Sequence, residues 1–193
     1  MQPRTYPTAA LGYRVLRADL EGRLHSLFSP YVWKDGINVA SCDQKLATYT
    51  GGKGAPTVHE APHSECVCGF YAYHDYQLAL TRVTKSNCLN LVVAAVAAKG
   101  QLEIHTAGWR AAEVQLLALS DVADRYHQLQ ERYRIPLLET EQFLSWVSKS
   151  VAKPVPQSLR PQAAHVTTLS SDKIFKDTLL DTVTSLHLGK AGR

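Results

Sequence analysis

Cysteine and histidine side chains gather in one short part of the chain. Three of the four cysteines, Cys42, Cys66 and Cys68, lie between residues 42 and 68, together with His59 and His63. Thiolate and imidazole groups are the ligands that a structural Zn²⁺ ion prefers, and four of them complete a tetrahedral shell. The cluster therefore predicts a metal site with a bound zinc ion as its cofactor.

The spacing of these residues favours one set of four ligands. Cys66 and Cys68 lie two positions apart, so on an extended segment both side chains point to the same face and can reach one ion. Cys42 adds a third sulfur. We favour His59 as the fourth ligand and keep His63 as the reserve, because a proline can redirect the chain between His59 and the two later cysteines. The predicted site is Cys₃His with a structural role.

Two other interpretations of the cluster stay open. Buried, reduced Cys66 and Cys68 beside exposed histidines would explain the same residues without a metal, since free cysteine is among the most buried residue types. A catalytic zinc needs an open coordination position and a nearby acid or base, which Glu60 or Glu65 could supply. The zinc-deaminase signature is not matched. A redox-active Cys66–Cys68 pair is disfavoured, because the Cys-x-x-Cys spacing is absent.

Strands are expected through the first two thirds of the chain. After a loose leader at residues 1–10, residues 11–33 are strand-like with a turn near Gly22. Residues 70–83 and 89–98 are rich in aromatic and β-branched residues, and the second stretch is a continuous apolar run typical of a buried central strand. A hairpin-like turn is expected at residues 99–101, and residues 102–106 alternate like a strand beyond it. After an interruption at residues 107–108, a further strand is expected at 109–119.

The periodicity changes to a helical one from Ser120 onward. Ser120 is a good N-cap, and apolar residues then repeat at helical spacing until Pro136. A short edge strand is expected at residues 135–138, and a second helix from Thr140. The apolar positions of the two helices are Val122, Tyr126, Leu129 and Tyr133, followed by Phe143, Leu144, Val147 and Val151.

Together these patterns predict an α+β protein. A β-rich, metal-clamped domain spans residues 11–119, and a helical extension of the same domain spans residues 120–151. Residues 152–193 form a linker and a basic, amphipathic C-terminal segment. Its expected helix, residues 171–188, carries Phe175 and Leu179 on its apolar face.

The net charge of +4 lies entirely in the C-terminal quarter. Residues 1–148 hold 14 basic and 14 acidic side chains, whereas residues 149–193 hold 7 basic and 3 acidic ones. A basic tail attracts nucleic acid, but these charges are scattered without interleaved aromatic residues. The longest apolar run, residues 91–98, is far shorter than a membrane span, and the N-terminus lacks the apolar stretch of a secretory signal. We expect a cytoplasmic protein without a membrane partner.

Three motifs occur in an order that is similar to that of a protein family. Asn-x-Ala-x-Cys occupies residues 38–42 after a tryptophan, Cys-x-Cys-Gly-Phe-Tyr-Ala occupies residues 66–72, and Gly-Trp-Arg-Ala occupies residues 108–111. Over roughly residues 11–140 this order resembles uncharacterised proteins of actinobacteria and mycobacteriophages. Phe70 departs from the usual isoleucine, and no Trp-Gly pair precedes residue 99. The resemblance implies a shared site at the three cysteines and a phage- or mobile-element-borne protein, but no activity.

The leading functional hypothesis is a non-enzymatic binding or adaptor protein that acts on a macromolecular partner, most simply a protein. No Gly-x-Ser-x-Gly motif marks a nucleophile. Phe175 and Leu179 fit a helix-in-groove contact, and Trp109 and Arg110 could bind a partner by stacking. A buried tryptophan beside an acid-paired arginine is the commoner arrangement. The alternatives are the zinc-dependent enzyme described above and a nucleic-acid-binding protein that uses the basic tail.

Overall fold

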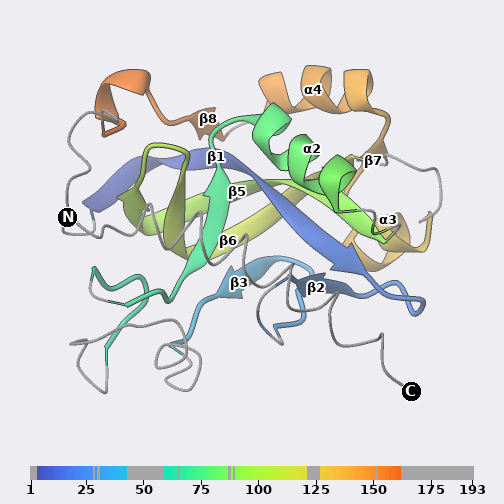
Figure 1. Ribbon diagram of the computed structural model, residues 1–193, viewed down its shortest axis with the longest axis horizontal. Helices are drawn as coiled ribbons and strands as arrows, with labels where there is room; N and C mark the ends of the chain where they lie inside the picture. Colours follow the sequence, from blue (N-terminus) through green and yellow to red (C-terminus); the bar gives the residue numbers. More distant parts are fainter. Residues whose placement is uncertain are drawn as a thin grey trace.

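The computed structural model describes residues 4–27, 29, 31–42, 59–64, 66–86, 88, 90–120, 127–150 and 152–161. Its eight strands belong to one sheet, and the helices pack on that sheet (Figure 1). The elements are, in chain order, β1 (Arg4–Ala18), β2 (Leu24–Ser26), β3 (Ile37–Val39), β4 (Phe70–Tyr73), α2 (Tyr76–Lys85), β5 (Leu91–Ile104), β6 (Gly108–Ser120), α3 (His127–Tyr133), β7 (Leu137–Leu138), α4 (Thr140–Ser148), β8 (Lys153–Pro154) and the 3₁₀ helix η1 (Gln157–Leu159). The α+β class is confirmed.

Three long antiparallel strands, β1, β5 and β6, form the centre of the sheet. β5 pairs with β1 on one side and with β6 on the other along most of its length. The short strand β4 pairs with β6 and also with β1, at Tyr13 and Tyr73. The strands β1, β5, β6 and β4 therefore close into a ring at one end of the sheet. β2, β3, β7 and β8 extend the outer edges.

The continuous apolar run of β5 is explained by burial on both faces. Val92, Val96 and the alanines in register with them belong to the core on one side of the sheet. Val93 and its alternate neighbours belong to the core on the other side. Because successive side chains of a strand point to opposite faces, a strand covered on both sides needs apolar residues at every position. The predicted central strand is confirmed.

The expectation of one strand over residues 70–83 is wrong after Tyr73. The strand ends there and helix α2 follows, because the Asp75 side chain accepts a hydrogen bond of 2.7 Å from the amide of Gln77 and caps the helix. The buried residues of α2 are Tyr76, Ala79 and Val83, at helical spacing. Aromatic and β-branched composition obscured this 3.6-residue period.

Helices α2 and α4 cover one face of the sheet (Figure 1). The Tyr76 ring of α2 lies 5.5 Å from the Phe143 ring of α4, centroid to centroid, and Val147 is also buried there. The expected apolar face of α4 is therefore confirmed at these two positions, whereas Leu144 is exposed.

Among the described residues, no helix combines the length and the apolar composition that a membrane-spanning segment needs.

Strand β6 extends to Ser120, and the first turn of the helix predicted to begin there, residues 121–126, lies outside the described residues. The hydroxyl of Ser120 lies 3.1 Å from that of Tyr76, inside the core. Helix α3 begins at His127, and Leu129 and Tyr133 are buried as expected. Val122 and Tyr126 lie outside the described residues. The short edge strand predicted near Pro136 is confirmed as β7, which pairs with β6.

Three further boundaries differ from expectation. The loose leader is wrong from Arg4 onward, because β1 begins there and pairs with the end of β5. Residues 99–101 are an irregularity within β5, at which Gly100 has a φ of 74°, and the hairpin turn comes after Ile104. The expected linker packs on the sheet at its start, where β8 pairs with β1 and Val155 is buried.

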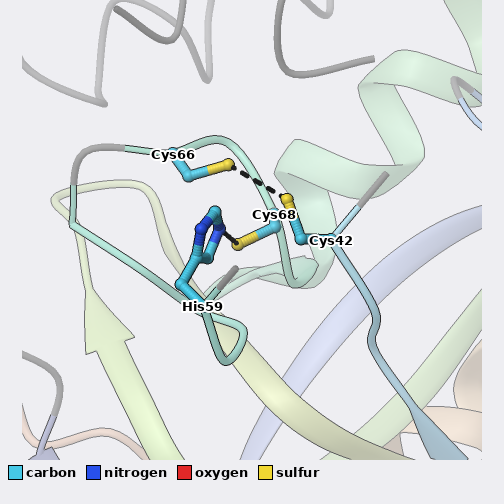
Figure 2. A group of neighbouring side chains, drawn as sticks. All are labelled: Cys42, His59, Cys66 and Cys68. Carbon is cyan, nitrogen blue, oxygen red and sulfur yellow. Dashed lines mark hydrogen bonds between the residues drawn. The ribbon is translucent and has the colours of Figure 1, made fainter. Parts of the chain in front are cut away.

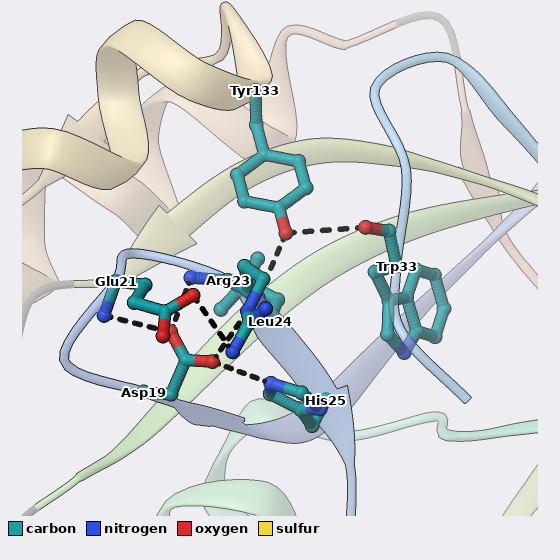
Figure 3. A network of polar contacts seen from close by, with 7 residues as sticks. All are labelled: Asp19, Glu21, Arg23, Leu24, His25, Trp33 and Tyr133. Atoms are coloured by element: carbon teal, nitrogen blue, oxygen red, sulfur yellow. Dashed lines mark hydrogen bonds and ion pairs between the residues drawn. The ribbon is translucent and has the colours of Figure 1, made fainter. Parts of the chain in front are cut away.

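The turn between β1 and β2 is organised by one carboxylate (Figure 3). Asp19 accepts hydrogen bonds from the amides of Glu21 and Arg23, at 3.0 and 2.8 Å, and from the side chains of Arg23 and His25, at 2.7 and 2.8 Å. Desolvation opposes ionisation of Asp19, but the Arg23 amide and the other donors outweigh it and hold its pKa well below the ordinary value. The turn therefore depends on a charged Asp19.

Tyr133 joins helix α3 to this corner of the sheet (Figure 3). Its hydroxyl accepts a hydrogen bond of 2.7 Å from the amide of Leu24 and donates one of 3.1 Å to the carbonyl of Trp33. Because all three residues are buried, these bonds satisfy backbone groups that have no access to water.

Replacing Gly12 with alanine is expected to destabilise the fold. A Cβ at this position would lie 2.6 Å from the Trp109 ring and 2.8 Å from Ala72. Overpacking of this kind costs about 1–3 kcal/mol. The loss is measured as the difference in unfolding free energy between wild type and Gly12→Ala in denaturant. Trp109→Phe removes the ring atoms involved, so the double variant is expected to lose less than the sum of the two single losses. Additive losses would show that the contact is not the cause.

Replacing Asp19 with asparagine is expected to remove a pH-dependent part of the stability. Because the pKa of Asp19 is lowered in the folded chain, its contribution is present above the unfolded pKa of about 4 and is lost as the pH falls below it. The difference in unfolding free energy between wild type and Asp19→Asn should therefore shrink on acidification from pH 6. The matched control is Glu21→Gln, on an exposed carboxylate of the same turn. A difference that is constant with pH would contradict this assignment.

Candidate metal centre

Two short strands along one edge of β6 bring the cysteines together. β3 pairs with β6 up to Val39 and Glu113, and β4 pairs with β6 from Phe70 and Ala111 onward. The end of β3 and the start of β4 are therefore neighbours along this edge. Cys42 follows β3 closely and Cys68 precedes β4 closely, so segments far apart in the sequence meet at one junction.

Four side chains converge at this junction (Figure 2). The ligand atoms of Cys42, His59, Cys66 and Cys68 all lie within 4.8 Å of one another. The sulfur atoms of Cys42 and Cys66 are 3.6 Å apart, and the Cys68 sulfur lies 3.4 Å from Nε2 of His59. Cys66 and Cys68 are buried, and Cys42 and His59 are partly exposed.

These separations suit a tetrahedral ion. With metal–sulfur bonds of about 2.3 Å and metal–nitrogen bonds of about 2.0 Å, the ligand atoms of a tetrahedron lie roughly 3.5–3.8 Å apart. The Cys42–Cys66 and Cys68–His59 separations are close to these values, and the remaining ones extend up to 4.8 Å. The residues predicted from the sequence thus form a cluster that could hold a metal ion.

His63 lies beside the cluster, and its ring packs against that of His59 with the centroids 4.8 Å apart. His59, the favoured ligand, is the histidine whose ring nitrogen lies among the sulfur atoms. His63 takes part through its backbone, since its carbonyl accepts a hydrogen bond from the amide of Cys66 at 2.9 Å.

The side chain of Arg110 holds the segment that carries Cys66 and Cys68. Arg110 is fully buried on β6, and it donates hydrogen bonds to the carbonyls of Cys66, Cys68 and His63. The distance to the His63 carbonyl is 2.7 Å. One buried side chain thus fixes three backbone positions around the two cysteines.

Glu103 supplies the charge that Arg110 needs in the interior. Glu103 lies opposite Arg110 in the β5–β6 register, is 3% exposed, and accepts a hydrogen bond of 2.8 Å from Nε of Arg110 and a second one from its terminal nitrogen. A buried guanidinium without an anion would be strongly destabilising. The ion pair is therefore part of the support of the cysteine segment.

A glycine and a tyrosine hydrogen bond shape the turn into β4. Gly69 has a φ of 114°, and a Cβ there would lie 3.3 Å from the carbonyl oxygen of Ala111, so glycine suits both the backbone and the space. The Tyr71 hydroxyl donates a hydrogen bond of 2.9 Å to the carbonyl of Val67. Both contacts constrain the segment between the two cysteines and the strand.

The two neighbouring thiols differ in acidity. Burial disfavours the thiolate of Cys66, but the Cys68 amide and the hydrogen bonds of the cluster outweigh burial and lower the pKa of Cys66. Burial, helped by the negative charge on Cys66, raises the pKa of Cys68 to about 12. Because metal ligation requires thiolates, binding of an ion must displace the proton of Cys68.

The residues predicted to bind a partner do not form an exposed surface among the described residues. Trp109 and Arg110 are fully buried, so their assignment to a partner-binding surface is wrong. The Trp109 ring donates a hydrogen bond of 3.0 Å to the carbonyl of Leu11, inside the core. Phe175 and Leu179 lie outside the described residues.

Of the acidic residues considered for catalysis, Glu60 is exposed and contributes no ligand atom to the cluster. Glu65 lies outside the described residues.

The commoner arrangement named above, a buried tryptophan beside an acid-paired arginine, is present, but Glu103 was not identified as the acid, although a signal for it exists. A strand was expected on each side of residue 107, and a hairpin centred near residues 106 and 107 places Glu103 directly opposite Arg110. Opposite charges at such cross-strand positions indicate a pair. Interpreting Arg110 together with its sequence neighbour Trp109 concealed that relation.

No protein-family model matches the chain, and the searches of curated proteins and of solved structures also found no match. The resemblance to actinobacterial and mycobacteriophage proteins therefore stays a prediction.

Glu103→Gln is expected to weaken metal binding without touching a ligand. Loss of the carboxylate leaves Arg110 buried without an anion, which costs about 3–5 kcal/mol. Loosening of the carbonyls that Arg110 holds should lower metal affinity by about 10–100-fold, measured by chelator competition. The matched control Glu113→Gln, at an exposed position of β6, should change neither quantity appreciably. Wild-type affinity in folded Glu103→Gln would contradict the role of the pair.

Proposed function

We propose that the cluster of Cys42, His59, Cys66 and Cys68 binds a structural zinc ion, and that the protein is a non-enzymatic binding protein for another protein. The observation that carries the first part is the composition of the cluster. Three sulfurs and one imidazole nitrogen would complete a tetrahedral shell and leave no open position for water or substrate. Closed shells of this kind serve folding, whereas catalytic zinc sites keep a position free.

The location of the cluster supports a role in holding a binding surface. The ion would tie the end of β3 to the start of β4, beside the edge of β6. Ile37 and Val39 of β3 are 53% and 58% exposed, and their strand leads directly to Cys42. Zinc would thus fix the strand that displays these two apolar side chains, and a surface held in one conformation loses less freedom when it binds a protein partner.

The other two functions have less support. A zinc-dependent enzyme would need an acid or base beside an open coordination position. Glu60 does not fit this role, because its side chain is exposed and lies outside the cluster. Nucleic-acid binding would use the seven basic side chains of residues 149–193, and four of these, Lys173, Lys176, Lys190 and Arg193, lie outside the described part of the chain. The phage or mobile-element origin rests on the resemblance alone.

Metal analysis together with unfolding tests the structural role. Protein purified without a histidine tag should contain about one zinc ion per chain by elemental mass spectrometry. The Cys66→Ser/Cys68→Ser variant should lose the ion and at least about 3 kcal/mol of stability, or roughly 6–12 °C in Tm for a domain of this size. Cys88→Ser is the matched control, because Cys88 is exposed and outside the cluster.

Two results would contradict the proposal. If the wild-type protein is well folded but neither contains nor binds zinc, the proposed zinc site is ruled out. Zinc that can be stripped with a chelator without loss of stability would indicate a catalytic ion instead of a structural one.

A further inference from the structure

Two sulfur atoms of the cluster come from different parts of the fold and face each other. Cys42 follows β3 and Cys66 precedes β4, yet their sulfur atoms are 3.6 Å apart (Figure 2). A disulfide bond is about 2.05 Å long, so a small movement of the two side chains would join them. Cys42 is partly exposed, so a small oxidant dissolved in water has access to the pair.

We propose that Cys42 and Cys66 form a reversible disulfide on exposure to a hydroperoxide, and that this disulfide releases the zinc ion. This inference rests on the proposed zinc site. It makes the site a redox-sensitive one, in which the same two sulfurs either bind the metal or bond to each other.

With hydrogen peroxide as the hydroperoxide, the reaction balances. The Cys42 sulfur attacks one peroxide oxygen, the O–O bond breaks, and Cys42 becomes a sulfenic acid while hydroxide leaves. The Cys66 thiolate then attacks the Cys42 sulfur, the S–S bond forms, and a second hydroxide leaves. Two protons convert the hydroxides to water. The two sulfurs supply two electrons to the peroxide, and zinc stays Zn²⁺ throughout.

The geometry selects Cys42 as the partner of Cys66. Cys68 is closer to Cys66 in the sequence than Cys42 is. Its sulfur, however, is directed at His59, with 3.4 Å between the sulfur and Nε2 (Figure 2). The carbonyls of Cys66 and Cys68 are both held by Arg110, which restrains the backbone change that a bond between such close neighbours would need.

The disulfide would leave the surrounding fold in place. Arg110 holds the Cys66 segment from the core through contacts that involve no metal. The new bond would also replace the connection between the end of β3 and the start of β4 that the ion makes. Only Cys68 and His59 would remain as ligands, too few for a structural zinc site. A thiol reductant and zinc would then restore the original state.

The test uses the full chain loaded with zinc and kept under nitrogen. One equivalent of hydrogen peroxide is added, zinc release is followed with a chromogenic chelator, and disulfides are mapped by mass spectrometry of peptides. We expect about one zinc per chain to be released together with a Cys42–Cys66 disulfide. Dithiothreitol and added zinc should return both to the starting state.

Two variants sharpen this test. Cys88→Ser removes the cysteine outside the cluster and should behave as wild type. Cys42→His keeps four ligands but removes the sulfur that reacts with the peroxide, and we expect it to release zinc at least 10-fold more slowly. Disulfide mapping of the wild type decides the case even if Cys42→His fails to bind zinc.

The results separate this inference from the zinc proposal. Absence of zinc before oxidation would overturn both. Bound zinc that withstands peroxide, or release accompanied by a Cys66–Cys68 bond, would overturn the redox inference and leave the structural zinc site in place.

Discussion

The hydrogen bonds of Arg110 are the interaction on which the candidate site depends. Its guanidinium is fully buried, is neutralised by Glu103, and binds the carbonyls of His63, Cys66 and Cys68. Removing either charge would leave the other uncompensated in the interior, at a high cost in free energy. The sheet therefore holds the cysteine segment rigidly. A cation also lies beside a site that three thiolates and one Zn²⁺ ion would make negative.

The order of strands along β6 explains what a metal ion bound at this point would join. β3 and β4 share one edge of β6, and both are short, so each has few backbone hydrogen bonds of its own. A metal at their junction would connect Cys42 to Cys66 and Cys68 and stabilise both strands at once. The exposed apolar residues of β3 would then be displayed on a fixed strand. Under the proposed function, the ion would serve recognition through the fold and would take no part in a reaction.

Local patterns in the sequence were sufficient for some of this structure. The four clustered residues, the doubly buried strand β5 and the apolar face of α4 each follow from residue types at short spacing. The switch from strand to helix at Asp75 was missed because composition outweighed a single capping residue. The hold of Arg110 on the cysteine segment was missed because it depends on the β4–β6 register, which pairs residues that are distant in sequence. Patterns of neighbouring residues do not contain the pairing register of strands that are far apart in the sequence.

The composition of the metal shell is the most direct test of this account. X-ray absorption at the zinc edge of the purified full-length protein reports the atoms bound to the ion and their distances. The account predicts three sulfur ligands at about 2.3 Å and one nitrogen ligand at about 2.0 Å, without a bound water. A spectrum with an oxygen ligand, or with fewer than three sulfurs, would contradict a closed structural site formed by Cys42, His59, Cys66 and Cys68.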